Sequence, residues 1–185
     1  LESAALLGEV FSVAVLELDS SRQRDSGEAA RSEVDFALDV LEREGFIDAY
    51  DPSLSWYRFR SPHQVATVIE EASRRGHRHT ARRASELSRS GVEVWGDQPE
   101  HGGWIGDLLL RGGRPSEALD HWCANLDFHL ARGEYALAIP LVERADRLIA
   151  SGFEPAARPR WILERGRARI ALKLGALDFA LIHVR

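Results

Sequence analysis

Cysteine and histidine are two of the residue types in this chain that could ligate a metal ion or supply a nucleophile. The 185 residues include seven histidines and one cysteine. His77 and His79 are two residues apart on a predicted helix, about 200° around its axis, so they cannot share one metal ion. His121 and His129 are two helical turns apart, and Cys123 occupies an apolar helix position, where a buried thiol is inert unless a base lies beside it. We therefore expect no metal site, no catalytic residue and no enzymatic activity in this chain.

Motifs that bind nucleotides or activate a serine do not occur in the sequence. The chain has no Gly-x-Ser-x-Gly and no His-Glu-x-x-His arrangement. Residues 92–103 are rich in glycine, but they lack the Gly-Lys-Ser/Thr ending that places an ammonium and a hydroxyl on phosphates and metal. We interpret residues 92–103 as a connecting loop and expect no cofactor.

An arginine cluster and three tryptophans are the candidate interaction residues. Residues 63–90 hold six arginines against three glutamates. One interpretation is a patch that binds an anion or nucleic acid. The other is a solvated face whose arginines pair with glutamates at helical spacing, and the lack of interleaved aromatic residues favours this second interpretation. For each tryptophan, core packing is favoured over lining a binding groove. The candidate surface residues are Arg74, Arg75, Arg78, Arg82, Trp104, Trp122 and Trp161.

The elements that must position these residues are helices joined by a repeated corner. Residues 113–119, 133–139 and 175–181 each contain a glycine followed five residues later by alanine and a large aliphatic residue. The glycine ends one helix and the alanine lets the next helix pack closely, so the pattern predicts stacked helix pairs that bind proteins. Apolar stripes predict helices over 104–109, 119–130, 138–149 and 162–174, with an enlarged loop at 151–158. Pro140 should kink the third helix or delay its start.

The first sixty residues predict a winged helix. Residues 1–8 and 11–18 suit two short helices, and residues 19–32 are interpreted as an exposed loop or a weakly held helical turn. Val34, Leu38 and Leu41 form a helical stripe closed by Gly45. Strands at 46–50 and 55–60 would be joined by a tight turn at 51–54. The third helix carries five carboxylates over residues 31–44 against two arginines, so phosphate would be repelled and direct DNA binding is disfavoured.

Three segments of the chain resemble the winged-helix region of the STAND class of signalling ATPases. They are residues 4–11 (AALLGEVF), 37–47 (ALDVLEREGFI) and 57–62 (YRFRSP). The resemblance implies a winged helix between a nucleotide-binding core and an array of tetratricopeptide-like repeats, which holds the protein inactive until an inducer or partner binds. We accordingly expect a mainly α chain, with a winged-helix domain at 1–61, linking helices at 62–91 and degenerate, incomplete tetratricopeptide-like repeats at 92–185.

Composition places the chain among soluble globular proteins. Hydrophobic residues make up 44% and charged residues 29%, with a net charge of -5. The apolar N-terminal stretch carries Glu2 and Glu9 and lacks a basic start, no run is long enough to span a membrane, and one cysteine suits a reducing compartment, so we expect a cytoplasmic protein. The chain contains no methionine and stops at the third corner, which indicates a fragment of a larger protein.

Three functions remain open from the sequence. The leading hypothesis is a non-catalytic regulatory segment of a bacterial signalling ATPase or transcription regulator, whose repeats sense a protein partner, a sister domain or a small-molecule inducer. The second is a free-standing adaptor that binds peptides, and the third is a nucleic-acid binder that uses the arginine cluster.

Overall fold

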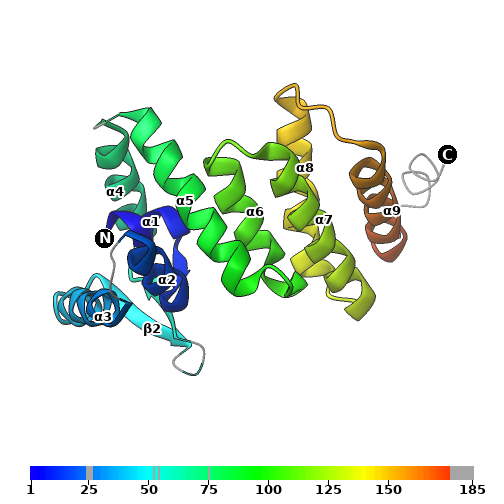
Figure 1. Cartoon of the computed structure of the whole chain (residues 1–185). Helices are drawn as coiled ribbons and strands as arrows, with labels where there is room; N and C mark the ends of the chain where they lie inside the picture. The colour runs from blue at the N-terminus through cyan, green and yellow to red at the C-terminus, as the bar shows by residue number, and fades with distance from the viewer. Residues whose placement is uncertain (24–26, 52, 54, 75, 176–185) are drawn as a thin grey trace. The chain divides into compact units, whose positions relative to one another are not determined.

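The computed structural model describes residues 1–23, 27–51, 53, 55–74 and 76–175 (Figure 1). This part of the chain is mainly helical and contains one three-stranded antiparallel sheet, as expected for a mainly α chain with a short hairpin. The chain divides into two compact units. The first comprises residues 1–95 and 111–113, and the second comprises residues 96–110 and those from 114 onward. The helices expected as a linker at 62–91 lie in the first unit.

The first unit has the topology of a winged helix, followed by two further helices. Its elements are α1 (Glu2–Leu7), β1 (Val10–Ser12), α2 (Val13–Gln23), α3 (Gly27–Arg43), β2 (Ile47–Asp51), β3 (Trp56–Phe59), α4 (Pro62–Arg74) and α5 (His77–Trp95). β3 is the central strand, with β1 and β2 antiparallel on either side. Figure 1 shows the β2 strand beside α3, as expected of a hairpin that follows the third helix.

Aromatic and aliphatic side chains from the sheet and α1 form the core of the winged helix. Phe11 of β1 is fully buried, and its ring lies 5.4 Å from that of Phe59 on β3 and 6.2 Å from that of Tyr57. Leu6 and Leu7 of α1 are also buried. Trp56 and Phe59, at the two ends of β3, are three residues apart, so their buried side chains lie on opposite faces of the sheet.

Of the two alternatives for residues 19–32, the exposed loop is wrong, because most of this stretch is helical. α2 continues to Gln23 and α3 begins at Gly27, while residues 24–26 lie outside the described part of the chain. Asp19, placed in that loop from its polarity, is only 3% exposed, and Ala30 is fully buried. These helical turns are stabilised by tertiary contacts that a scan for large apolar residues does not detect.

The start of α2 also differs from the prediction. Residues 10–12, expected partly as helix, form β1, whose Val10 and Ser12 pair with Arg58 and Trp56 of β3. All four ends of the hairpin strands β2 and β3 lie within one residue of the predicted positions. Of the predicted turn at 51–54, residues 52 and 54 lie outside the described residues; the Ser53 N–H donates to Asp51 Oδ1 over 3.0 Å.

α4 and α5 meet at Gly76, as predicted, but α5 continues past Gly91 to Trp95. The indole of Trp95 explains this extension, because its Nε1 donates to Ser12 Oγ over 3.2 Å and its ring lies 5.8 Å from that of Trp56. The predicted loop at 92–103 is therefore mostly wrong. Only residues 96–98 separate α5 from the short 3-10 helix η2 (Pro99–His101), which leads directly into α6.

The second unit consists of helices at the predicted positions. α6 (Gly102–Arg111), α7 (Pro115–Arg132), α8 (Tyr135–Ala150) and α9 (Ala157–Lys173) follow the four predicted stripes, and a loop separates α8 from α9. α8 begins at Tyr135 with Pro140 inside it, so its start is not delayed. The result is a helical-repeat-like arrangement in which α7 contacts both α8 and α9.

The predicted glycine corners are confirmed by the backbone. Gly113 and Gly133 have φ values of 76° and 74°, the left-handed conformation that glycine adopts without a Cβ penalty. The corner alanines Ala118 and Ala138 are fully buried, as close helix packing requires. Gly175 has a φ of 77°, and the rest of this third corner lies outside the described residues.

Gly106 of α6 allows α6 to pack closely against α7. A Cβ at Gly106 would lie 2.4 Å from Nε1 of Trp122, well inside van der Waals contact. The Trp122 indole uses this space to donate to the Gly103 carbonyl and to Asp107 Oδ1, both over 3.2 Å. The close approach therefore depends on the absence of a side chain at Gly106.

Candidate functional site

The described arginines of the predicted cluster mostly pair with glutamates of their own helices. Arg74 contacts Glu70 at 2.8 Å and Glu71 at 3.3 Å, and Arg82 lies 3.7 Å from Glu86. These contacts are the ones predicted by the paired-face interpretation. Arg78 is exposed, and Arg75 lies outside the described residues. Pairing leaves less positive potential for an anionic partner than the sequence count suggests.

The three candidate tryptophans occupy three different environments. Trp122 is buried in the core, as expected, and Trp104 is half-buried. Trp161 on α9 is 59% exposed, so the expectation of core packing is wrong for this residue. The Arg165 guanidinium lies over its ring, 4.5 Å from the centroid, and Arg165 also pairs with Asp127 of α7.

Exposed apolar residues continue along α9 from Trp161. Leu172 is exposed, and eleven residues of α-helix return it to nearly the same face as Trp161. We call Asp127, Trp161, Arg165 and Leu172 the Trp161 surface. Exposed aromatic and arginine side chains together are the composition found at protein interfaces.

In the second unit, the Cys123 thiol is buried and the His129 ring lies within hydrogen-bond distance of two partners. Burial, and to a smaller extent Asp120 and Asp127, raises the pKa of the Cys123 thiol to about 12. The His129 Nδ1 lies 2.8 Å from Glu134 Oε2, and its Nε2 lies 3.1 Å from the Asn125 amide nitrogen. Across the described residues, no group of three or more His, Cys, Asp or Glu side chains could hold a metal ion.

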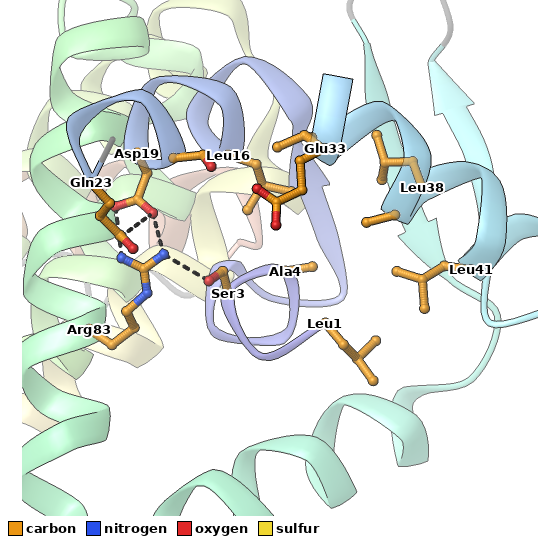
Figure 2. Close-up of a pocket in the computed structure, with 13 residues that line it drawn as sticks. Leu1, Ser3, Ala4, Leu16, Asp19, Gln23, Glu33, Leu38, Leu41 and Arg83 are labelled. Carbon is orange, nitrogen blue, oxygen red and sulfur yellow. Dashed lines mark hydrogen bonds and ion pairs between the residues drawn. The ribbon is translucent and has the colours of Figure 1, made fainter. Parts of the chain in front are cut away.

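A pocket of about 290 Å³ lies within the first unit, between α1, α2, α3 and one side chain of α5 (Figure 2). Its apolar wall consists of Ala4, Leu16, Val34, Ala37, Leu38 and Leu41. The last four are the apolar stripe predicted for the third helix. Leu38 is buried, but Val34 and Leu41 are only partly buried and Ala37 is exposed, so this stripe is not fully covered by the chain.

The polar end of the pocket is formed by Ser3, Asp19, Gln23, Glu33 and Arg83. Arg83 pairs with Asp19 through both of its terminal nitrogens, and its Nη2 also donates to Ser3 Oγ over 2.9 Å. Gln23 Nε2 donates to Asp19 Oδ2 over 3.2 Å. Figure 2 shows the Glu33 carboxylate directed toward the interior of the pocket. Sequence reasoning missed this site because Asp19 was assigned to a loop.

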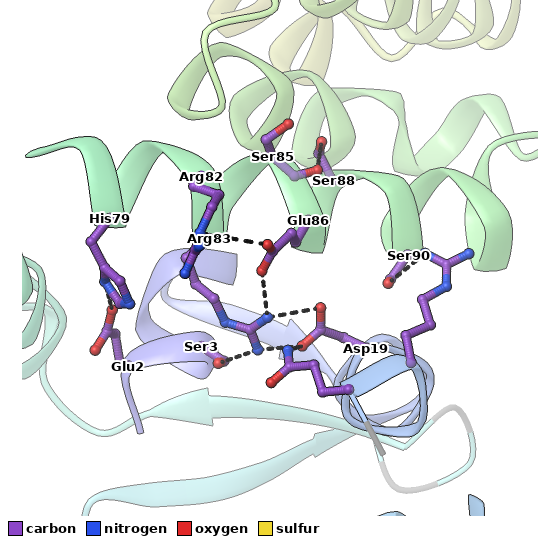
Figure 3. A network of polar contacts seen from close by, with 12 residues as sticks. Glu2, Ser3, Asp19, His79, Arg82, Arg83, Ser85, Glu86, Ser88 and Ser90 are labelled. Atoms are coloured by element: carbon purple, nitrogen blue, oxygen red, sulfur yellow. Dashed lines mark hydrogen bonds and ion pairs between the residues drawn. The ribbon is translucent and has the colours of Figure 1, made fainter. Parts of the chain in front are cut away.

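Arg83 belongs to a row of polar residues on α5 that faces α1 and α2 (Figure 3). Its members recur every three or four residues, which puts them on one side of the helix. We call them the α5 polar row: His79, Arg83, Glu86, Ser90 and Glu93.

Each end of the α5 polar row has its own partner. His79 Nδ1 lies 3.5 Å from Glu2 Oε1. At the other end, Arg22 of α2 donates to Ser90 Oγ over 3.1 Å and pairs with Glu93. α5 is thus attached to α1 and α2 by hydrogen bonds and ion pairs along most of its length. The three-and-four spacing of these polar residues was a signal for this contact in the sequence.

The exposed side of α3 is strongly acidic. Burial raises the pKa of the Tyr57 phenol, and the nearby carboxylates of Glu42, Asp39 and Asp35 raise it further. Phe36 is 70% exposed on the same helix. All six carboxylate side chains of this region are exposed: Glu28, Glu33, Asp35, Asp39, Glu42 and Glu44.

No helix in the described ranges is long and apolar enough to cross a membrane. Comparison of the chain with family models, with curated proteins and with solved structures finds no match.

Proposed function

We propose that this chain is a non-catalytic regulatory and protein-interaction segment of a larger signalling ATPase or transcription regulator of the STAND class. In this proposal the helical repeats bind a protein partner or a sister domain, and the winged helix transmits the bound state. The protein acts in the cytoplasm, and its second unit is a degenerate tetratricopeptide-like array.

The observation that carries the proposal is the acidic third helix of a winged-helix topology. In a winged helix that binds DNA, this helix enters the major groove and supplies Arg, Lys, Asn or Gln to base edges. Here α3 presents five exposed carboxylates, and one of its two arginines, Arg31, lies 3.4 Å from Glu17. A helix with this charge is repelled by phosphate, which favours a regulatory role over DNA binding.

The Trp161 surface supports the interaction part of the proposal. Its exposed indole and arginine are the residue types that dominate binding energy at protein interfaces. A free-standing peptide-binding adaptor is the second candidate, because the same surface would serve it equally well.

Two experiments separate these functions. In the first, fluorescence anisotropy of a labelled 20-base-pair duplex is followed at low and at physiological salt; we expect no binding under either condition. Tight binding at low salt that weakens steeply with added salt would replace the proposal with nucleic-acid binding.

The second experiment uses the full-length gene product. We expect a Gly-rich loop ending in Gly-Lys-Ser/Thr upstream of Leu1, and binding of ATP that substitution of that lysine by alanine abolishes. A full-length product that neither carries the loop nor binds ATP would leave the adaptor as the better function.

A further inference from the structure

We propose that the Trp161 surface binds an acidic peptide segment of a protein partner, with carboxylates on the arginines at the start of α9 and a large apolar side chain on the exposed indole. The inference rests on the protein-interaction function proposed above and names the chemistry of the partner. It concerns the second unit alone.

The charge of the second unit is unevenly distributed. Residues 114–156 hold four arginines against seven carboxylates. α9, in contrast, holds five arginines and one lysine against Glu164 alone. Positive charge in the described part of this unit is therefore concentrated on α9, which makes an acidic segment the complementary partner.

Four of the six cations on α9 are already engaged inside the second unit. Two of them form ion pairs with neighbouring carboxylates, a third donates to a backbone carbonyl, and the fourth lies over an aromatic ring. These contacts are Arg165 with Asp127, Arg167 with Asp146 and Glu164, Arg169 with the Leu130 carbonyl, and Lys173 with the Tyr135 ring. Most of them join α9 to α7 or α8, so these four side chains hold the unit together.

Arg158 and Arg160 are the two remaining cations. Both are exposed in the first turn of α9, and neither forms an ion pair within the described part of the chain. An arginine at this position adds to the positive end of the helix dipole, so a negative charge supplied by a partner is stabilised here. A guanidinium can hold a carboxylate through two parallel hydrogen bonds, which suits the side chains of Asp and Glu in a peptide.

The apolar part of the surface lies beside these arginines. Arg158 is three residues before Trp161, so the two side chains share one side of α9. Trp161 and Leu172 are 59% and 54% exposed, and covering apolar surface of this kind is favourable. Eleven residues of α-helix separate them by about 16 Å along the axis, which about five residues of an extended peptide span. The segment that fits best therefore carries two large apolar residues five positions apart, between carboxylates.

A peptide fits this surface better than a nucleic acid strand does. One face of the Trp161 ring is covered by the Arg165 guanidinium, 4.5 Å from the centroid, which leaves a single face for stacking. Proteins that bind single strands combine several stacking side chains with a basic groove that follows the backbone. A strand that continued beyond α9 would meet the acidic segment 114–156, which repels phosphate.

Four probes test the proposal on the whole 185-residue chain. They are the peptide Glu-Leu-Glu-Glu-Ser-Glu-Leu-Glu, the same peptide with Lys for Glu, the same peptide with Ser for Leu, and an eight-base oligothymidylate. Binding is followed by two-dimensional NMR of the five tryptophan indole N–H signals, with that of Trp161 assigned from Trp161→Phe. We expect the acidic leucine peptide to shift the Trp161 signal and to bind about tenfold more tightly than each of the other probes.

Every other result of the titration overturns the proposal. Equal or tighter binding of the lysine peptide or of the serine peptide would show that charge or apolar contact does not select the partner. Tighter binding of the oligothymidylate would assign the surface to nucleic acid. A Trp161 signal that shifts with protein concentration alone would assign it to a second copy of the chain, and a signal that no probe shifts would show that the surface is not available.

Two substitutions with matched controls locate the contact, measured by fluorescence anisotropy of the labelled acidic peptide. Arg158→Glu should weaken binding about tenfold, whereas Arg147→Glu, the same change at an exposed arginine of α8, should have little effect. Trp161→Ala should weaken binding at least about tenfold, whereas Leu137→Ala, at a residue of α8 that is 56% exposed, should not. Equal effects of a substitution and its control would overturn the proposal.

The result can be told apart from a failure of the proposed function. If the acidic peptide does not bind and the full-length product still carries the ATP-binding loop, only the chemistry of the partner is wrong. If the peptide binds and the full-length product lacks that loop, the inference stands and the adaptor becomes the better function.

Discussion

The Asp19–Arg83 ion pair makes a quantitative prediction about the stability of the first unit. The side chain of Asp19 is 4% exposed and that of Arg83 is 16% exposed, and the two residues join α2 to α5. Removing one partner of a buried pair costs about 3 to 5 kcal/mol, because the other charge stays buried without compensation. Since Arg83 retains some exposure, we expect Arg83→Met to lower the free energy of unfolding by about 3 kcal/mol.

A matched control and a double substitution separate this effect from simple loss of an arginine. Arg74 is also paired with two glutamates, but its side chain is 68% exposed, so Arg74→Met should cost less than about 1 kcal/mol. Asp19→Leu combined with Arg83→Met removes both buried charges and should recover most of the loss, because replacing a buried pair by apolar residues is often neutral.

The assay is urea unfolding followed by circular dichroism, with hydrogen exchange measured on peptides from α2, α5 and α8. A loss of 3 kcal/mol corresponds to about 12 to 24 °C in Tm for a unit of fewer than 100 residues. Faster exchange should be confined to α2 and α5, because α8 belongs to the other unit. The reasoning fails if Arg83→Met costs no more than Arg74→Met, or if the double substitution is as unstable as the sum of the single ones.

Three further predictions concern the second unit. Gly106→Ala should destabilise it by about 1 to 3 kcal/mol in urea unfolding, since the new Cβ overlaps the Trp122 indole 2.4 Å away; an unchanged midpoint would contradict the packing described here. The Cys123 thiol, with its pKa raised to about 12, should react with iodoacetamide at pH 8 only after denaturation, and rapid labelling of the folded chain would refute this. Above pH 9 the free energy of unfolding should fall, because the thiol ionises in the unfolded chain before it does in the folded one. Burial lowers the pKa of His101 and of His121, so the unfolded state takes up protons first and stability should fall as the pH drops below about 6.5, which the pH dependence of Tm measures; replacing both by Gln should flatten that dependence.

Local signals explain why the second unit was predictable from the sequence. A left-handed residue strongly favours glycine, so Gly113 and Gly133 mark helix ends regardless of what surrounds them. The apolar stripes of α6 to α9 repeat at the helical period over enough turns to be recognised. Exposure of Trp161 was not predictable, because it depends on which helices pack against α9 and not on the sequence of α9 itself.

The parts of the first unit that were mispredicted depend on distant partners. β1 has three residues, too few for an alternating pattern, and it forms because β3 supplies a partner more than forty residues later. Asp19 looked like a loop residue because of its charge, and its burial requires Arg83, which lies 64 positions further along the chain. Asp19 and Arg83 both line the pocket, so inspection of residues 19–32 alone could not have found it.

The two units hold their helices together by different kinds of contact. In the second unit, α7 packs on its neighbours through Leu119, Leu126 and Leu130. Moving these side chains apart would destabilise the unit, because a closely packed core loses contacts when any of its groups is displaced. In the first unit, α5 is attached to α1 and α2 through the α5 polar row, whose contacts can be exchanged for water or for the groups of a ligand. Asp19 and Arg83 form the least exposed ion pair of this attachment, with side chains 4% and 16% exposed, so moving α5 away from α2 would separate two buried charges.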